Sequence, residues 1–289
     1  MKNTLPSTPT FGPGGNGDLF YAEGGKSTND APLWVKNFGL DAYEFEAGNG
    51  IRGSAELFSA IGRAAADADI SMSFHTPYFI SLSGVEAEKR LKSIDYIRDS
   101  LNAAALMGAK TIVVHSGSAA KISREEAMYL ASDTIARTLE AIPDNGVKIG
   151  LETMGKINQL GTLDEVIELC KIDKTRLVPV VDFGHLNARD LGSVFCSADD
   201  YIRVFDKIAC ELDEEKAKNL HCHFSKIEWT GSGEKRHLTF EDQTYGPQFE
   251  PLMEALYTHS LTPTLISESA GTQADDALAM KKYFLGLEK

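Results

Sequence analysis

Short apolar runs alternate with longer amphipathic segments along most of this chain. Eight runs have the length and the β-branched or aromatic content that are typical of strands. They cover residues 9–12, 41–47, 70–75, 111–115, 147–152, 178–182, 219–224 and 263–268. Segments such as 55–68, 125–142, 162–171 and 249–260 lie between these runs. Their apolar residues recur at steps of three and four, which predicts helices, and Ser123 and Thr162 precede acidic residues as helix caps do.

Strands that alternate with helices predict a parallel sheet covered by helices. Eight such units in a chain of this length fit a (β/α)8 TIM barrel, which takes about 250 residues. A doubly wound open sheet is the alternative, but the sequence has no GxGxxG after the first strand and no Walker-type phosphate loop. Because no linker-like stretch divides the chain, we predict one domain over residues 1–289, with residues 1–8 as a flexible tail.

Composition and charge narrow the class of protein. Of the 289 residues, 43% are hydrophobic and 25% are charged, which is ordinary for a soluble globular protein. The net charge of -13 disfavours nucleic acid, although a local basic patch or bound cations could still receive a phosphate. The four cysteines form no CxxC pair, and no apolar run approaches the roughly 20 residues that span a bilayer. We therefore expect a cytoplasmic protein without a membrane segment.

Most of the predicted strands carry a metal-ligand type of residue at or near the carboxyl end. These residues are His75, His115, Glu152, Asp182, His221 and Glu268. In a barrel the carboxyl ends of all strands meet at one face, where the active sites of this fold lie. Taken alone, each residue is better explained as a hydrogen-bonded histidine, an ion-paired glutamate or a capping aspartate. Six at the same position favour a metal site, because carboxylates gathered without a cation would carry unpaired buried charge.

The types of ligand narrow the choice of metal. Imidazole mixed with carboxylate suits zinc, and also manganese or iron, whereas Mg²⁺ prefers oxygen ligands alone. None of the cysteines lies where a strand-end ligand is needed. The site is therefore expected to be catalytic in character, with carboxylates that can bridge two ions.

Six blocks of sequence stand in a familiar order along most of the chain. They are HTPYFISL (75–82), VVHSGS (113–118), LETMGKINQLGTLDEV (151–166), VVDFGHLNARD (180–190), HCHFSK (221–226) and ISES (266–269). Together they resemble the endonuclease IV family of zinc-dependent apurinic/apyrimidinic endonucleases, within the xylose isomerase-like barrel superfamily. The resemblance implies two zinc ions bridged by Glu152. By this resemblance His75 and His115 would bind the first ion, and Asp182, His221 and Glu268 would complete the site of the second.

The resemblance also implies a third zinc ion, bound by His185 and His237. Where the family has an Asp in this site, the chain has Lys235. A protonated lysine cannot bind a metal and repels a cation. Glu234 or His223 could replace the missing Asp and hold a weaker ion, or the ammonium of Lys235 could take the place of the ion.

The activity implied by the resemblance is hydrolysis of a phosphodiester at an abasic site in DNA. Two ions would activate a water and stabilise the attacking and leaving oxygens. Glu152 would bridge the ions, Glu268 would orient the attacking water, and Lys235 or further ions would neutralise the phosphate. Tyr78 and Lys226 lie in the matching blocks and are expected to contact substrate. We expect a monomer whose partner is DNA or a small sugar or phosphate substrate.

Two other functions stay open at this point. A sugar isomerase, epimerase or dehydratase on the same barrel would share most of the ligand set, with one metal that polarises a hydroxy-ketone. The added pair His75 and His115 favours the nuclease. The net charge and the loop 48–54, which lacks the aromatic and Gln content with which the family penetrates DNA, favour the sugar enzyme. A non-catalytic barrel is disfavoured, because structural zinc sites are usually closed and four-coordinate.

Overall fold

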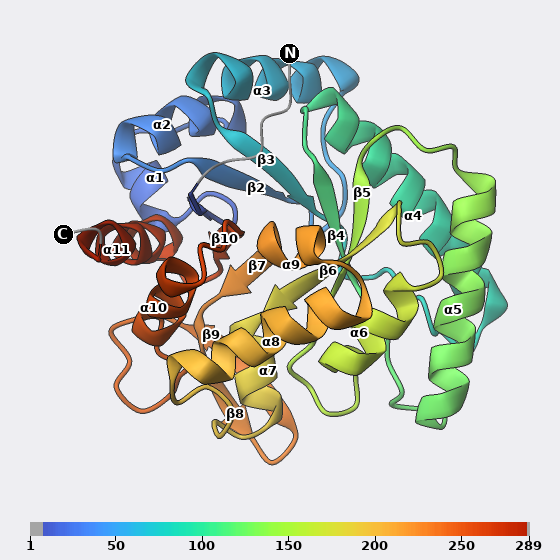
Figure 1. The fold of residues 1–289 in the computed structure, drawn as a ribbon. Helices are drawn as coiled ribbons and strands as arrows, with labels where there is room; N and C mark the ends of the chain where they lie inside the picture. The colour runs from blue at the N-terminus through green and yellow to red at the C-terminus, as the bar shows by residue number, and fades with distance from the viewer. Residues whose placement is uncertain (1–7, 288–289) are drawn as a thin grey trace.

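Eight parallel strands form the centre of the molecule, and helices surround them (Figure 1). This computed structural model describes residues 8–287, and its sheet has the order β1-β10-β7-β6-β5-β4-β3-β2. The strands are β1 (Thr10–Pro13), β2 (Ala42–Glu46), β3 (Ser71–His75), β4 (Thr111–His115), β5 (Lys148–Glu152), β6 (Leu177–Asp182), β7 (His221–Phe224) and β10 (Thr264–Ser267). Each end of a strand lies within two residues of its predicted position. The predicted TIM barrel is confirmed.

The barrel closes where β1 and β2 approach each other. The amide of Gly15 donates a hydrogen bond of 2.9 Å to the carbonyl of Glu44. Gly12 permits this approach, since a Cβ at that position would lie 1.8 Å from the carbonyl oxygen of Ala42. A glycine inside a strand often marks such close contact between backbones.

The helices surround the barrel (Figure 1). They are α1 (Asp18–Ala22), α2 (Ala31–Phe38), α3 (Ala55–Ala68), α4 (Ala87–Leu106), α5 (Arg124–Ala141), α6 (Leu163–Cys170), α7 (Phe183–Arg189), α8 (Ala198–Glu211), α9 (Glu214–Lys218), α10 (Glu250–Thr258) and α11 (Gln273–Gly286), with a 3-10 turn at Thr28–Asp30. The predicted caps are confirmed, because the side chains of Ser123 and Thr162 accept hydrogen bonds from the amides of Glu126 and Glu165.

Both faces of the barrel strands are buried, which explains why the sequence shows apolar runs rather than strict alternation. Polar side chains nevertheless lie inside the barrel. Glu44, Ser73 and His223 are at most 4% exposed. Such groups need partners, because a buried polar group without a hydrogen bond is costly.

An antiparallel hairpin, which the sequence did not predict, follows β7. It consists of β8 (Lys226–Thr230) and β9 (Gly233–Leu238). Its residues are mostly polar, so the apolar pattern that revealed the barrel strands is missing here. The hairpin packs against α7 and brings residues of β9 to the carboxyl end of the barrel.

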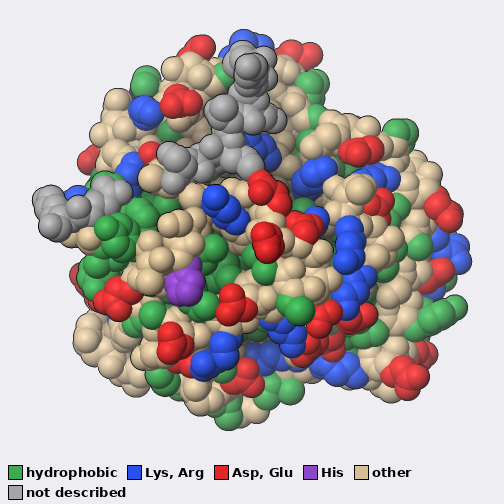
Figure 2. All heavy atoms as spheres, in the orientation of Figure 1, with side chains coloured by type: hydrophobic (Ala, Val, Ile, Leu, Met, Phe, Trp, Pro, Cys, Tyr) green, Lys and Arg blue, Asp and Glu red, His purple; other side chains and the backbone are tan. Residues whose placement is uncertain are grey.

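The rest of the chain adds little that bears on the site. Of the predicted tail at residues 1–8, Thr8 is exposed and residues 1–7 lie outside the described part. Acidic and basic side chains are interspersed over the face drawn in Figure 2. Across residues 8–287, every helix is too short or too polar to cross a membrane.

Candidate metal centre

Glu152 lies at the centre of the candidate site. It is the last residue of β5 and is completely buried. Its Oε1 lies 3.0 Å from Nδ1 of His223, and its Oε2 lies 3.3 Å from Nε2 of His115 and 3.6 Å from Nε2 of His75. Among the described residues, Oε2 has no hydrogen-bond partner. A buried carboxylate oxygen that faces two imidazoles fits a position that a cation would complete.

The first group of ligand atoms belongs to His75, His115 and Glu152, and these atoms lie within 4.8 Å of one another. The three residues end the neighbouring strands β3, β4 and β5. The Nδ1 of His75 lies 2.9 Å from the carbonyl oxygen of Thr76. A proton on Nδ1 is held there, and Nε2 is left to face Glu152 and a cation. The structure thus brings together the three residues that the sequence groups around the first ion.

The second group joins Glu152 to Asp182, His223 and Glu268, again with ligand atoms within 4.8 Å. Asp182 ends β6, and its Oδ1 accepts a hydrogen bond of 2.7 Å from the amide of His185 at the start of α7. Its Oδ2 is buried and has no partner among the described residues. Asp182 therefore caps a helix with one oxygen and offers the other to a cation.

The second group contains His223 and not His221, the residue that the sequence assigned to the second ion. Both side chains face the barrel interior because they are two residues apart on β7. His221 lies nearer the amino end of the strand, where its Nε2 is 2.8 Å from Oε2 of Glu44. His223 pairs in register with Asp182 and so reaches the strand ends. A shift of two residues keeps a side chain on the same face, so the motif match alone does not reveal it.

The third group consists of His185, Glu234 and His237. The Nδ1 of His185 lies 2.9 Å from the carbonyl oxygen of Thr153, and its Nε2 lies 3.5 Å from Oε2 of Glu234. The hydroxyl of Ser225 is 2.8 Å from Nδ1 of His237. In both histidines one nitrogen is held by the protein, so that the other is available to an ion.

Lys235 points away from the site, which corrects its expected role in catalysis. Its Nζ lies 2.6 Å from Oε1 of Glu228, and its side chain is 52% exposed. The third site therefore has a carboxylate, from Glu234, where the sequence comparison suggested an ammonium.

A bulge in the β8–β9 ladder explains this exchange. The register shifts between Glu228 and Trp229, which leaves Lys235 as the residue of β9 without a partner opposite. In a regular strand, residues on one face are two apart, but the extra residue puts Glu234 and His237 on the same face.

The two predicted substrate contacts have different surroundings. Lys226 is 3% exposed, and its Nζ donates to the carbonyls of Phe240 and Asp242 at 2.9 and 2.6 Å. These two bonds use two of the three N–H donors of the ammonium and hold the chain after β9 in place. Tyr78 is 56% exposed, and its ring stacks on His115 with centroids 5.4 Å apart. Tyr78 therefore lies beside the first ligand group, and its contact with substrate stays a prediction.

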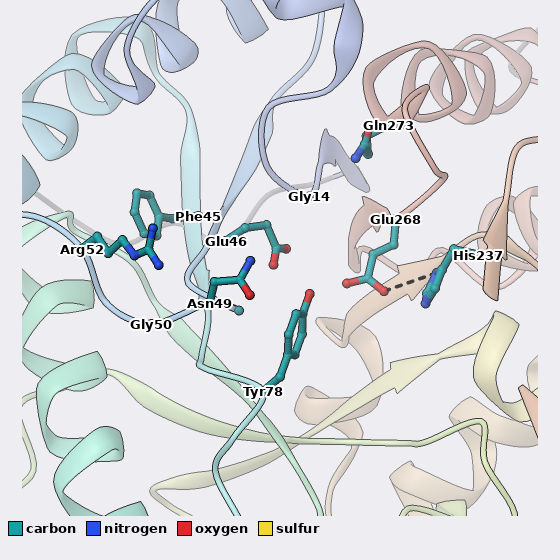
Figure 3. Close-up of a pocket in the computed structure, with 11 residues that line it drawn as sticks. Gly14, Phe45, Glu46, Asn49, Gly50, Arg52, Tyr78, His237, Glu268 and Gln273 are labelled. Carbon is teal, nitrogen blue, oxygen red and sulfur yellow. Dashed lines mark ion pairs between the residues drawn. The ribbon is translucent and has the colours of Figure 1, made fainter. Parts of the chain in front are cut away.

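Two adjoining cavities, of about 420 and 450 Å³, open onto the ligand groups. Both are lined by Tyr78, His237 and Glu268. Figure 3 shows the smaller one, with the hydroxyl of Tyr78 pointing into the space between Glu46 and Glu268. A substrate in either cavity can therefore touch the same tyrosine and the same glutamate.

Sequence reasoning missed Glu44 and Glu46 of β2. Both face inward because they are two residues apart, and Glu46 lines the smaller cavity. The signal was present in DAYEFEA (41–47), where two acidic residues alternate with aromatic ones in a strand predicted to be buried. His223 and Glu234 were considered only as substitutes in the third site.

Without ions, the histidines and carboxylates of the site share protons. Burial lowers the pKa of His75, but Glu46 and Glu152 outweigh it and raise the pKa to about 10. Burial acts to raise the pKa of Glu152, yet the hydrogen bond with His223 and the nearby imidazole of His75 hold it well below its usual range. Burial raises the pKa of Glu268 well above its usual value. Protons on these groups take up the charge that cations would otherwise balance.

The donor set fits divalent cations. Imidazole nitrogens and carboxylate oxygens converge, and the unpartnered oxygens of Glu152 and Asp182 lie within the ligand groups. A mixed set of this kind suits zinc, manganese or iron. The buried His and Glu clusters therefore indicate a metal-binding centre.

Comparison with known proteins places the chain in a broad family. Residues 32–282 match the family described as xylose isomerase-like TIM barrel. An uncharacterized protein of Methanocaldococcus jannaschii is 31% identical over 217 residues, which cover 74% of this chain and 77% of that protein. A probable endonuclease 4 of Acholeplasma laidlawii is 30% identical over 188 residues, which cover 63% of this chain and 61% of that protein. The structure of a D-tagatose 3-epimerase-like protein superposes with a TM-score of 0.65 at 21% identity, covers 86% of this chain and 89% of its own, and shows the shared fold.

Proposed function

Because the chain belongs to the xylose isomerase-like TIM barrel family, we propose that it is a zinc-dependent phosphodiester hydrolase that resembles endonuclease IV and acts on abasic sites in DNA. The observation that carries this proposal is the presence of three ligand groups around one site, two of which share Glu152. Displacement at a phosphodiester uses ions on both the attacking and the leaving oxygen, whereas a sugar isomerase can work with one metal. The similarity to a probable endonuclease 4 supports the same activity.

The chain's own residues suit this reaction. Bound divalent ions would supply Lewis acidity toward a phosphate and make a water more acidic. Glu268 belongs to a ligand group and also lines both cavities, so its carboxylate can orient the attacking water and accept its proton. Glu152 is completely buried and belongs to both the first and the second ligand groups, which restricts its orientation. The hydroxyl of Tyr78 points into the cavity and can donate to a phosphate oxygen.

The phosphate would meet positive side chains other than Lys235. Lys156 lines the larger cavity and Arg52 the smaller one. Both lie at the rim of the site, where long cationic side chains can reach a phosphate while their stems stay with the protein. We assign to these two residues the neutralising role that the sequence gave to Lys235.

One observation favours a second candidate, a metal-dependent sugar epimerase or isomerase. Glu46 faces Glu268 across the smaller cavity, and carboxylate oxygens of Glu44, Glu46 and Glu268 come within 4.8 Å of one another. Two carboxylates on opposite sides of a small substrate can remove a proton from one face and return it to the other. The D-tagatose 3-epimerase-like protein of similar fold is consistent with this alternative.

A cleavage assay separates the two candidates. We expect the zinc-reconstituted protein to nick a duplex that contains one abasic site and to leave the matched intact duplex uncut. Glu268→Gln should lower the rate by about 100-fold or more, because the negative charge that orients the water is lost while the size is kept. Lys235→Ala serves as the control and should cut within a few-fold of wild type, since Lys235 points away from the site.

The same protein should be tested in parallel on a panel of ketoses and sugar phosphates. Conversion of one of these sugars, together with an uncut abasic duplex, would replace the proposed hydrolase by the epimerase. In that case Glu46→Gln should abolish the conversion, since Glu46 is the carboxylate that faces Glu268 across the cavity.

A further inference from the structure

The imidazole of His223 connects the second ligand group to a buried carboxylate beneath it. Its Nδ1 faces the ligand group, 3.0 Å from Oε1 of Glu152 and 3.2 Å from Oε1 of Glu268. Its Nε2 lies 2.8 Å from Oε1 of Glu44 on β2. The ring is completely buried, so neither nitrogen can turn to solvent for a partner.

The tautomer of His223 follows from this placement. A neutral imidazole carries one proton, and the nitrogen that binds a cation must be the unprotonated one. A cation in the second group therefore requires the proton to be on Nε2, which faces Glu44. Nε2 of His223 and Oε1 of Glu44 are both buried without a hydrogen bond among the described residues, although they lie 2.8 Å apart, so each is the nearest partner available to the other.

Glu44 is itself held in place from two sides. The hydroxyl of Ser73 donates to its Oε2 at 2.7 Å, and Nε2 of His221 lies 2.8 Å from the same oxygen. Glu44 is completely buried. One of its oxygens is thus occupied by these two groups, and the other is directed at His223.

His223 differs in this respect from His75, His185 and His237. The second nitrogen of His75 and that of His185 face the backbone carbonyls of Thr76 and Thr153. That of His237 faces the hydroxyl of Ser225. These acceptors are neutral, whereas His223 faces a carboxylate. A charged acceptor makes the stronger hydrogen bond and raises the basicity of the nitrogen that binds metal.

We propose that Glu44 is a positioning residue, which fixes His223 in the tautomer that binds metal and strengthens it as a ligand of the second ion. His221 and Ser73 hold Glu44 in the required orientation. This role concerns metal binding alone, so it holds whichever substrate the enzyme uses.

A further ion bound by Glu44, His221 and His223 is the competing explanation, since their donor atoms also lie within 4.8 Å of one another. The distances favour the positioning role. Two ligand atoms on a tetrahedral zinc ion are about 3.3 Å apart, given bonds of roughly 2.0–2.1 Å. The contacts of Glu44 with His221 and His223 are both 2.8 Å, which is the length of a hydrogen bond.

The test uses the metal-free protein and cobalt or zinc, without any substrate. Competition titrations against a chelator give the dissociation constants of successive ions for wild type, Glu44→Gln and Glu44→Ala. We expect Glu44→Ala to lower the affinity for one ion by about 10–100-fold. Glu44→Gln should lower this affinity less, because its amide oxygen still accepts the hydrogen bond from Nε2 of His223 but lacks the negative charge. The visible absorption of the cobalt form should change with the same ion.

Ser225→Ala is the matched control, because it removes the partner of His237 in the third group. Ser225→Ala should lower the affinity for a different ion, and the dissociation constant of the ion that depends on Glu44 should stay within about twofold of wild type. Thermal unfolding of the metal-free variants checks the fold. If Glu44→Ala does not fold, the isosteric Glu44→Gln carries the test.

Three results would overturn the proposal. Unchanged dissociation constants in Glu44→Gln and Glu44→Ala would show that His223 binds metal without the carboxylate. An equal loss of affinity for every ion would indicate that Glu44 has only a structural role. Loss of one whole ion from the stoichiometry, with the remaining affinities unchanged, would show that Glu44, His221 and His223 form a metal site of their own.

Discussion

His221 and His223 have the same residue type and face the same interior, yet they have different neighbours. His223 approaches the carboxylates of Glu152 and Glu268, whereas His221 contacts Glu44 in the layer below. The difference comes from their height along β7, since only His223 pairs in register with the strand end at Asp182. A metal ligand is thus defined by its depth in the barrel as well as by its chemistry.

We expect His223→Ala to lower the number of bound ions by one, because the second group would keep only carboxylates. His221→Ala should keep the full number of ions, with a weaker ion at the second group because Glu44 loses one contact. Elemental analysis after zinc reconstitution and desalting measures both. Equal stoichiometry in the two variants would contradict the assignment of His223.

A second prediction at the residue scale concerns the neighbours Glu234 and Lys235. Glu234→Gln should weaken the third ion by about 10-fold or more, since a carboxylate ligand is replaced by a neutral amide. Lys235→Ala should change it little, because its ammonium pairs with Glu228 on the other side of the hairpin. Anomalous scattering at the zinc edge reports the occupancy of each site. A large increase in the occupancy of the third site in Lys235→Ala would show that the charge of Lys235 repels an ion bound there.

At the scale of elements, the β8–β9 hairpin decides which residue serves the third group. The bulge lets Glu234 stand three residues before His237 and still share its face. A regular strand would achieve the same with a spacing of two, which is the spacing between Lys235 and His237.

This geometry predicts that deletion of Lys235 is tolerated. The deletion would turn the bulge into a regular ladder with the same pairs opposite each other, so Glu234 and His237 would stay on one face. The third ion should then bind within a few-fold of wild type in a chelator competition. Insertion of one glycine after Lys235 is the control, and it should abolish the third ion because the alternation of faces changes. Loss of the third ion in the deletion variant would contradict the role given to the bulge.

For the whole molecule, the charges of the site should make metal-free stability depend on pH. Burial lowers the pKa of His185 and His75, but the surrounding carboxylates, chiefly Asp182 for His185 and Glu46 for His75, together outweigh it and raise the pKa values to about 9 and about 10. An unfolded chain releases these protons near pH 6.5. The folded state therefore binds more protons above that pH, and its free energy of unfolding falls as the pH rises toward about 10.

Urea unfolding of the chelator-treated protein, followed at several pH values between neutral and about pH 9, tests this sign. The slope should approach roughly 1.4 kcal/mol per pH unit for each extra proton held by the folded state. Zinc-loaded protein is the control, and its stability should not fall in this window, because ions replace the protons. A metal-free protein that becomes more stable from pH 7 to pH 9 would show that the histidines are neutral.

The sequence alone determined the barrel and the location of its site. The spacing of apolar residues within each segment predicts whether it is a strand or a helix. A parallel barrel then necessarily brings the carboxyl ends of its strands together at one face. His75, His115, Glu152, Asp182 and Glu268 were found in this way, since a ligand-type residue at the end of an apolar strand is visible without any contact.

Tertiary structure decided what depends on pairing between distant segments. A period of two does not distinguish His221 from His223, and only the register of β7 against β6 does so. The bulge that exchanges Lys235 for Glu234 arises between two strands and has no signature in either one. Lys226 is bound by backbone carbonyls that come from a later loop. In all three cases the role of a residue depends on which groups lie opposite it on a neighbouring strand or in a later loop. Local sequence patterns do not reveal these neighbours, and the folded structure does.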